Sequence, residues 1–374
     1  MNIINKTAIV ILTCADFESL EISLAMHAKY NNHNADIFIL QNGRGTYDCE
    51  RTYRVAKRYE NLYPKQIKVV DFISPKVPYL SIKELLNSKI MSKYDYICKV
   101  DEDTFPLTNN WLNNLCKCYE ESYFKYGDNL GYVTGLVNNN PWGFPRVLKL
   151  MNLEEEYFKK YSRVHYVGMD NYNYGNNVKK LEIWDNTKIC DSGFGTVWRI
   201  PYISRLIHGK TTLNRLEYIK NTSDKGYEEI DNGKRYSINC ILFKKEFWNN
   251  INIGDYDDEH NCLIYCYNND KKIISALNVP LVHLFFFTQR EENKDLIPII
   301  RDYYSKVIDA PYPITICEDK QIENENRLRH LENVIWQINN RTIKRNIWDF
   351  IFSISEDGKY RIITIFGIRI TLKK

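Results

Sequence analysis

Short apolar runs alternate with helical patterns over the first hundred residues. Four of these runs have the length of a strand, at residues 8–13, 36–40, 67–72 and 94–100. Asp16 is placed to cap a helix after the first run, and Ser81 with Glu84 forms a capping box for another helix, whose apolar face would include Ile82 and Ile90. This alternation predicts an α/β fold with a mostly parallel sheet flanked by helices.

The pattern changes after residue 105. A helix is expected around residues 111–119 and a strand at 131–137, whereas the polar, aromatic stretch 138–234 predicts long loops with a few helices. Regular structure is expected again near residue 236, with a helix starting by Lys244, an acidic turn at 255–259 and a strand that ends at His283. The main domain therefore extends to about residue 292.

Residues 293–374 predict a C-terminal appendage of a helix and a β-hairpin. Four apolar residues recur at steps of three and four, which indicates a packed helical face: Leu328, Leu331, Ile335 and Ile338. Asp357 and Gly358 form a hairpin turn signal between two alternating segments. A small antiparallel sheet is expected there.

The distribution of charge along the chain indicates which kinds of molecule it could bind. The net charge is +4, but residues 341–374 hold eight Lys or Arg against three acidic residues, so the rest of the chain sums to −1. This balance argues against nucleic-acid binding. The basic, aromatic tail suits either an anionic membrane surface or a packed hairpin with solvated charges. Because no apolar run approaches the roughly 18 residues of a membrane span, we expect a cytoplasmic protein, peripheral to the membrane at most.

An acidic triplet follows the fourth predicted strand, in the order Asp101, Glu102 and Asp103. Ligands of open parallel sheets bind beyond the carboxyl ends of the strands. A carboxylate pair in that place can hold a hard divalent cation whose other ligands are diphosphate oxygens. The alternative is a solvated acidic turn.

Together, the first strand, the polar glycine turn after the second strand and the segment 94–103 resemble GT-A-type glycosyltransferases, loosely over residues 6–290. The ending 366–374 is similar to the tails of bacterial surface-polysaccharide enzymes of capsule and lipooligosaccharide synthesis. The resemblance implies a Rossmann-like nucleotide-sugar half over about 1–137 and an acceptor half over about 138–292. It also implies a nucleotide-sugar donor, a UDP-sugar first among them, and a saccharide or glycolipid acceptor.

The resemblance further implies roles for individual residues. Asp103 would bind Mn²⁺ or Mg²⁺, with Asp101 beside it as a donor contact, and His283 would complete the metal shell unless it is a packed core residue. The other expected donor contacts are Thr13, Asn42 and Lys99. Gln41 and Asn42 stand where many relatives have an acidic residue facing the base, so the nucleobase is left open.

Catalysis requires a base for the acceptor hydroxyl. The acidic cluster before His283 offers Asp258 and Glu259, with an ordinary hydrated helix start as the alternative. Three tryptophans in the loop-rich region are candidates to stack on the acceptor sugar or to anchor the core: Trp142, Trp184 and Trp198.

Two other functions fit parts of the pattern. A sugar nucleotidyltransferase uses a similar sheet and metal carboxylates, but the segment after the first strand lacks the expected glycine-rich basic loop. A non-catalytic saccharide-binding protein would leave the acidic turns merely solvated. The glycosyltransferase interpretation, with direct displacement and inversion, is the hypothesis carried forward, although retaining enzymes share the fold and the triplet.

Overall fold

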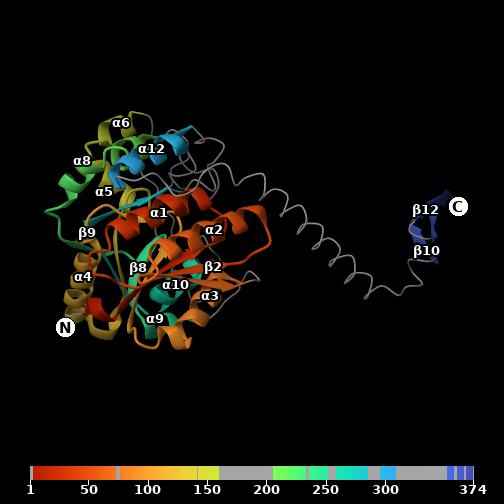
Figure 1. Ribbon diagram of the computed structural model, residues 1–374, viewed down its shortest axis with the longest axis horizontal. Helices are drawn as coiled ribbons and strands as arrows, with labels where there is room; N and C mark the ends of the chain where they lie inside the picture. Colours follow the sequence, from red (N-terminus) through yellow and green to blue (C-terminus); the bar gives the residue numbers. More distant parts are fainter. Residues whose placement is uncertain are drawn as a thin grey trace. The chain divides into compact units, whose positions relative to one another are not determined.

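The computed structural model describes the residues 3–72, 76–140, 142–159, 205–232, 236–251, 258–284, 295–308, 352–357, 360–365 and 368–373. The chain divides into two compact units, one formed by residues 1–44 and 48–314 and the other by 315–374 with 45–47. Figure 1 shows the larger unit as a sheet flanked by helices, and the described residues of the smaller unit form three strands.

Nine strands of the described residues form one sheet in the order β3-β2-β1-β4-β8-β6-β9-β5, with β7 paired to β9. Neighbours in the β3-β2-β1-β4 half are parallel, whereas β8 runs antiparallel to both β4 and β6. The strands are β1 Thr7–Thr13, β2 Ile37–Asn42, β3 Ile67–Phe72, β4 Tyr96–Asp101, β5 Thr104–Pro106, β6 Leu130–Val137, β7 Tyr227–Ile230, β8 Cys240–Lys244 and β9 Lys272–His283.

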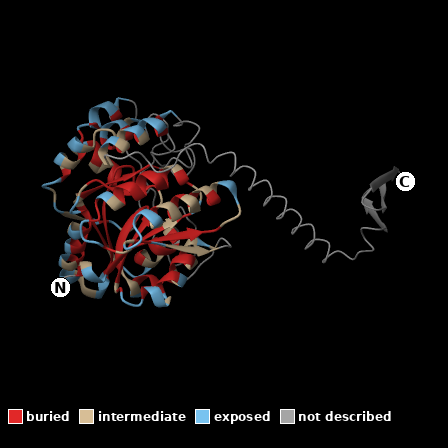
Figure 2. Cartoon of the chain, in the orientation of Figure 1, coloured by how far each residue is buried: buried red, intermediate tan, exposed pale blue. Residues whose placement is uncertain are grey.

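Both faces of the sheet are covered, which explains why its strands are apolar on both sides. Ile9 and Ile11 of β1 belong to one core, and Ala8 and Val10 belong to the other. Figure 2 shows the buried interior between the helical layers. The first core packs against α1 Phe17–Lys29, α2 Tyr47–Leu62, α4 Trp111–Tyr126 and α12 Leu296–Ile308; the second packs against α3 Pro78–Leu86, α9 Lys245–Asn249 and α10 Asp258–Asn268.

Shorter elements complete the larger unit. The sequence predicted long loops with a few helices for the region 138–234. Its described residues contain short helices, as predicted, and the strand β7, which was not predicted. The helices there are α5 Gly143–Leu150, α6 Glu154–Phe158, the π-helix η7 His208–Thr212 and α8 Arg215–Thr222. Elsewhere in the described part of the chain, 3₁₀ turns are formed by η1 Ile3–Lys6, η2 Lys89–Met91 and η3 Gly127–Asn129.

The predicted α/β class and the first four strands are confirmed, and so is the cap of α1. The Asp16 carboxylate accepts the backbone N–H of Ser19 at 3.3 Å and its hydroxyl at 2.7 Å. The predicted capping box is wrong. Helix α3 begins earlier, at Pro78, so Ser81 lies inside it and donates to Asn42 at 2.7 Å. The predicted apolar face also ends sooner, because Ile90 lies beyond α3 and is 49% exposed.

The centre of the sheet differs most from the prediction. The predicted helix starting by Lys244 is confirmed, since α9 begins at Lys245 with Lys244 as its N-cap. The strand β8, which ends at Lys244, was not predicted. This five-residue strand joins β4 to β6 and so connects the two halves of the sheet. The short strands β5 and β7 were not predicted either, because their register depends on distant pairing with β9.

The smaller unit contains an antiparallel sheet in the order β10-β11-β12, with bounds Phe352–Asp357, Tyr360–Ile365 and Ile368–Lys373. This confirms the predicted small sheet. The predicted helical seam from Leu328 to Ile338 lies outside the described residues.

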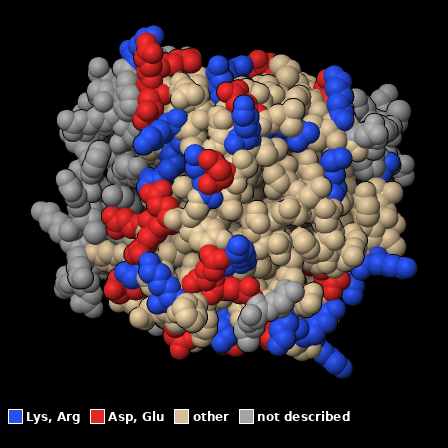
Figure 3. Space-filling view, turned by 90° about the vertical axis from the view of Figure 1, so that its left-hand side faces the viewer, with Lys and Arg blue, Asp and Glu red and all other residues tan. Residues whose placement is uncertain are grey.

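The surface of the larger unit mixes both signs of charge on the face seen in Figure 3, where Lys and Arg are interspersed with Asp and Glu. Within the described part of the chain, no helix combines the length and the apolar character that a membrane crossing requires.

His27 of α1 provides a test of the core between α1 and the sheet. Its ring is 1% exposed, contacts Trp111 edge-on and places Nε2 3.1 Å from the carbonyl oxygen of Thr104. Burial lowers the pKa of His27 to about 4, although the bond to Thr104 opposes this shift. The unfolded chain therefore binds more protons than the folded chain between pH 6.5 and 4.

We expect acid to destabilise the fold through His27. Stability should fall as the pH drops from about 6.5 to 4, and His27→Leu should reduce that fall by up to about 3 kcal/mol. Urea unfolding at a series of pH values measures the slope. The exposed His33 supplies the matched control, since His33→Gln should keep the wild-type slope. Equal slopes for His27→Leu and wild type would contradict the prediction.

Candidate active site

Strand β4 delivers the central charged residues. Lys99 and Asp101 are two residues apart on this strand and therefore lie on the same side of the sheet, whereas Val100 between them packs in the opposite core. The strand ends at Asp101, and Asp103 follows in the next turn. The triplet thus lies at the carboxyl end of a central strand, as predicted.

The Lys99 ammonium bridges two carboxylates from distant parts of the chain. Its side chain is only 1% exposed, and Nζ lies 2.5 Å from Asp101 Oδ1 and 3.3 Å from Asp258 Oδ2. It also donates to the carbonyl oxygen of Ile238 at 3.1 Å. Burial lowers the pKa of Lys99, but the charges of Asp101 and Asp258 raise it by more, so the net pKa lies above its ordinary value. The ammonium therefore stays charged in the core.

The pKa of Asp101 is shifted by its surroundings. Burial raises its pKa to about 6, assisted by the charges of Asp258 and Asp103 and opposed by Lys99. Its second oxygen, Oδ2, accepts a hydrogen bond from the side-chain amide of Asn239 at 3.2 Å. Both oxygens of Asp101 are thus oriented by neighbouring donors.

His283, the last residue of β9, lies against Asp103. Its Nε2 is 3.1 Å from Asp103 Oδ2, and its Nδ1 is 2.7 Å from Asn139 Oδ1. The Asn139 amide nitrogen donates to the His283 carbonyl at 2.8 Å, so Asn139 Oδ1 is an acceptor and Nδ1 carries the proton. This tautomer directs Nε2 at Asp103. Burial lowers the pKa of His283, but Asp103 raises it to a net value above the ordinary one.

These residues have the chemistry of a two-ligand metal site. Within the described ranges, no group of three or more His, Cys, Asp and Glu side chains is placed to hold a metal ion. Asp103 and His283 supply one carboxylate and one imidazole, and their 3.1 Å separation suits adjacent ligands on metal bonds of about 2.1 Å. Magnesium-like ions commonly use one or two carboxylates and take further ligands from phosphate and water. The pair therefore fits a metal–diphosphate site.

Glu102, to which the sequence analysis assigned no role, connects two loops in the structure. Its carboxylate accepts backbone N–H groups of Cys14 at 2.9 Å, Asp16 at 3.2 Å and Ala15 at 3.4 Å. The loop after β1 is thereby tied to the loop after β4. The only sequence signal was the adjacency of the two predicted strand ends.

Thr13 and Asn42, both predicted donor contacts, form hydrogen bonds to other residues of the chain. The Thr13 hydroxyl donates to Gln41 at 2.9 Å. The Asn42 amide donates to the Lys76 carbonyl at 2.8 Å and accepts the backbone N–H of Lys76 at 3.1 Å and the Ser81 hydroxyl at 2.7 Å. Thr13 and Asn42 therefore support the loops around the site in this structure.

The predicted acceptor residues are mostly outside the described part of the chain. Trp184 and Trp198 fall there. Trp142 lies in the core, 2% exposed, with the Arg146 guanidinium 3.5 Å above its ring. It is thus a packing residue, the alternative considered for it. Glu259 is partly exposed in the first turn of α10, next to Asp258, and donates its backbone N–H to Asp258 Oδ1 at 3.0 Å.

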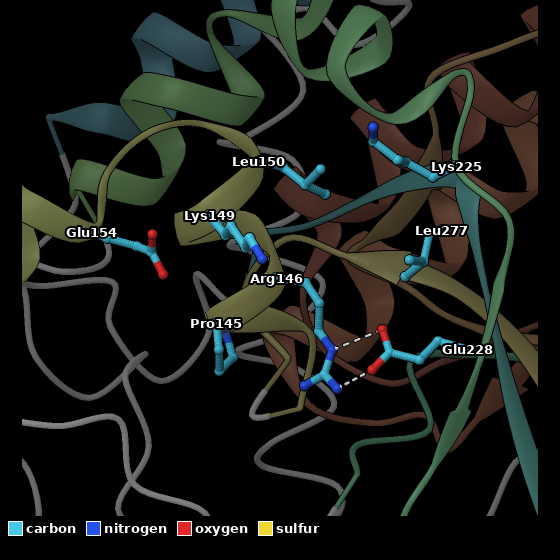
Figure 4. A pocket seen from close by; sticks show the side chains of 8 residues that line it. All are labelled: Pro145, Arg146, Lys149, Leu150, Glu154, Lys225, Glu228 and Leu277. Atoms are coloured by element: carbon cyan, nitrogen blue, oxygen red, sulfur yellow. Dashed lines mark hydrogen bonds and ion pairs between the residues drawn. The ribbon is translucent and has the colours of Figure 1, made fainter.

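A pocket of about 570 Å³ lies beside α5 and shares no lining residue with the acidic site. Figure 4 shows Arg146 of α5 paired with Glu228 of β7 at its edge, while the Lys225 side chain extends away from this pair. Arg146 Nε donates to Glu228 at 3.2 Å. This pair braces Trp142, because the same guanidinium covers the indole ring.

No protein-family model and no curated protein matches the chain. Solved structures do match it. S. aureus TarS 1–349 is 10% identical with a TM-score of 0.38, covering 87% of this chain and 72% of that one. GalNAc-T7 with UDP, GalNAc and Mn²⁺ is 11% identical with a TM-score of 0.40, covering 96% and 64%. The bifunctional WbbM structure is 10% identical with a TM-score of 0.32, covering 71% and 38%.

These three neighbours are glycosyltransferases. The chain spans less than two thirds of the GalNAc-T7 and WbbM chains, and 43% of a longer TarS chain. With identities near 10% and TM-scores below 0.5, the likeness assigns no activity to this chain. The functional assignment therefore rests on the geometry of the site.

The buried Lys99 ion cluster generates a stability prediction. Lys99→Met leaves the carboxylates of Asp101 and Asp258 side by side without their cation, so we expect a loss of about 3–5 kcal/mol in unfolding free energy. Adding Asp258→Asn should recover part of that loss. Lys6→Met is the matched control, because it removes the exposed pair with Asp95 and should leave the urea midpoint near that of wild type. A Lys99→Met chain as stable as the control would refute this account.

Proposed function

We propose that this chain is a glycosyltransferase that moves a sugar from a nucleoside diphosphate donor, with UDP-sugars tested first, onto a saccharide or glycolipid acceptor. The observation that carries the proposal is the convergence of Asp101, Asp103 and Asp258 around Lys99 and His283 at the carboxyl end of β4. The catalytic domain would span residues 1–292, with 293–374 as an appendage. A bacterial surface polysaccharide is the acceptor class that the sequence favours.

The position of the cluster supports a nucleotide site. Strands β1, β2 and β3 extend the sheet in one direction and β4 extends it in the other, so the strand order reverses between β1 and β4. Ligands of open α/β sheets bind at such a reversal, beyond the carboxyl ends of the strands. Asp101 ends β4 at this reversal, opposite Leu12 of β1, and Asp103 follows two residues later.

Asp103 and His283 are the residues that would hold Mn²⁺ or Mg²⁺. Such an ion neutralises negative charge that develops on a departing nucleoside diphosphate. Asn139 keeps the imidazole in the tautomer whose Nε2 is directed at Asp103, which is the orienting role that neighbours of metal ligands commonly have.

Asp258 is the proposed general base. As the acceptor hydroxyl oxygen forms its bond to the anomeric carbon, the Asp258 carboxylate takes the hydroxyl proton, and the bond from that carbon to the diphosphate oxygen breaks with inversion. Lys99 fixes the orientation of Asp258 from one side and the backbone N–H of Glu259 fixes it from the other. This convergence on Asp258 favours it as the base over Glu259.

Removing the Asp103 carboxylate should separate metal-dependent binding from folding. We expect Asp103→Asn to weaken UDP binding in the presence of Mn²⁺ at least about tenfold and to abolish sugar transfer, because one of two metal ligands loses its charge. Calorimetry with and without Mn²⁺ measures the binding. The surface variant Asp302→Asn is the control. Full transfer activity in Asp103→Asn would refute the metal role.

The base assignment predicts a different kinetic signature. Asp258→Asn should lower kcat by about 10²–10⁴-fold while the donor KM changes little, whereas Glu259→Gln should retain most activity. The assay follows UDP release from UDP-sugars, which also distinguishes glycosyl transfer from nucleotidyl transfer, since the latter releases pyrophosphate from a nucleoside triphosphate. The reverse ranking of the two variants would assign the base to Glu259.

A further inference from the structure

Glu102 joins the two loops that border the reversal point of the sheet. Strands β1 and β4 are parallel neighbours, with Leu12 opposite Asp101, so the loops that follow them emerge side by side. The three backbone N–H groups of residues 14–16 converge on the Glu102 carboxylate, with Cys14 on Oε2 and the other two on Oε1. The three residues of the acidic triplet, Asp101, Glu102 and Asp103, therefore have two different roles. The outer two belong to the acidic site, and the middle residue holds the neighbouring loop.

The same loop is held from its other side by Gln41 of β2. The Gln41 amide nitrogen donates to the carbonyl oxygens of Cys14 at 3.3 Å and Gly43 at 3.0 Å, and Gln41 Oε1 accepts the Thr13 hydroxyl at 2.9 Å. Gln41 is fully buried. Side chains from β2 and from the turn after β4 thus hold the loop 14–16, although loops at the rim of a sheet are usually mobile.

We propose that Glu102 is a positioning residue for the donor nucleotide, acting by fixing the loop 14–16 as one wall of the crevice between β1 and β4. This inference rests on the proposed function. Without the carboxylate, three N–H groups lose their acceptor, and the loop has to be ordered again whenever a nucleotide binds. That ordering lowers affinity for the donor, whereas the proton transfer at Asp258 is unaffected once the donor is bound.

The proposal predicts a split between donor binding and turnover. In Glu102→Ala, the Kd for UDP with Mn²⁺ and the donor KM should rise about tenfold, and kcat at saturating donor should stay within about threefold of wild type. Glu102→Gln retains one acceptor oxygen and should give a smaller rise. It also provides a second variant if Glu102→Ala folds poorly.

Glu120 offers a matched control for a purely structural carboxylate. Its Oε1 accepts the backbone N–H of Ile3 at 3.1 Å, in a contact between α4 and η1. Glu120→Ala should reduce stability without changing the Kd for UDP. If Glu102 had only a structural role, Glu102→Ala and Glu120→Ala would both lose stability and both keep the wild-type Kd for UDP.

The rate at which Cys14 is alkylated reports on the loop 14–16, both in the wild-type chain and in the Glu102→Ala variant. The Cys14 side chain is exposed, in contrast to the other described cysteines, all of which are buried. UDP with Mn²⁺ should slow the alkylation of Cys14 by N-ethylmaleimide in the wild-type chain, as read from the mass of the peptide that contains it. In Glu102→Ala, protection should require about tenfold more UDP.

The outcomes separate this inference from the proposed function. A wild-type chain that binds UDP, combined with a Glu102→Ala variant that has the same Kd, KM and Cys14 protection, overturns the positioning role alone. A wild-type chain that binds neither UDP nor GDP in the presence of Mn²⁺ overturns both. Weaker binding in Glu102→Ala but not in Glu120→Ala supports the proposal.

Discussion

The candidate site depends on one buried ammonium group. An isolated carboxylate or ammonium in a protein core costs several kcal/mol, so charges remain there only when each is matched at close range. Lys99 meets that condition by contacting Asp101 and Asp258, which are 157 residues apart in sequence. Because helices cover both faces of the sheet, the Lys99 side chain on β4 cannot reach solvent. The buried charge of Lys99 therefore requires Asp258, the first residue of α10, to lie beside it, and this fixes where α10 begins to pack on the sheet.

Side-chain amides organise the rest of the site. Asn239 donates to Asp101, Asn139 orients His283, and the amide of Asn140 donates to Asn239 Oδ1 at 3.3 Å. Amides carry no charge, so they fix the acidic and imidazole groups without changing the charge that a ligand meets. The loop after β6 supplies two of them, which explains why a polar stretch that predicts no strand nevertheless belongs to the structured centre of the molecule.

Sequence reasoning identified what is local and missed what depends on tertiary contact. The alternation of strands and helices, the cap at Asp16 and the triplet after β4 are local patterns, and the structure contains all three. The insertion of β8 between β4 and β6 was not predictable from its five residues, because antiparallel pairing on both sides defines it. The capping box failed for a related reason: Ser81 bonds to Asn42 of β2 instead of to its own helix.

Charge balance favours the proposed metal dependence on grounds independent of any ligand geometry. Asp101, Asp103 and Asp258 bring three carboxyl groups to the site, and Lys99 compensates them with one permanent positive charge. A nucleoside diphosphate would add further negative charge beside Asp101, whose pKa is already raised to about 6, first by burial and then by the charges of Asp258 and Asp103. Like charges at such short range oppose binding strongly in a partly desolvated site. In the proposed function, a divalent cation held by Asp103 and His283 would offset this excess negative charge and so allow an anionic donor to bind beside the acidic site.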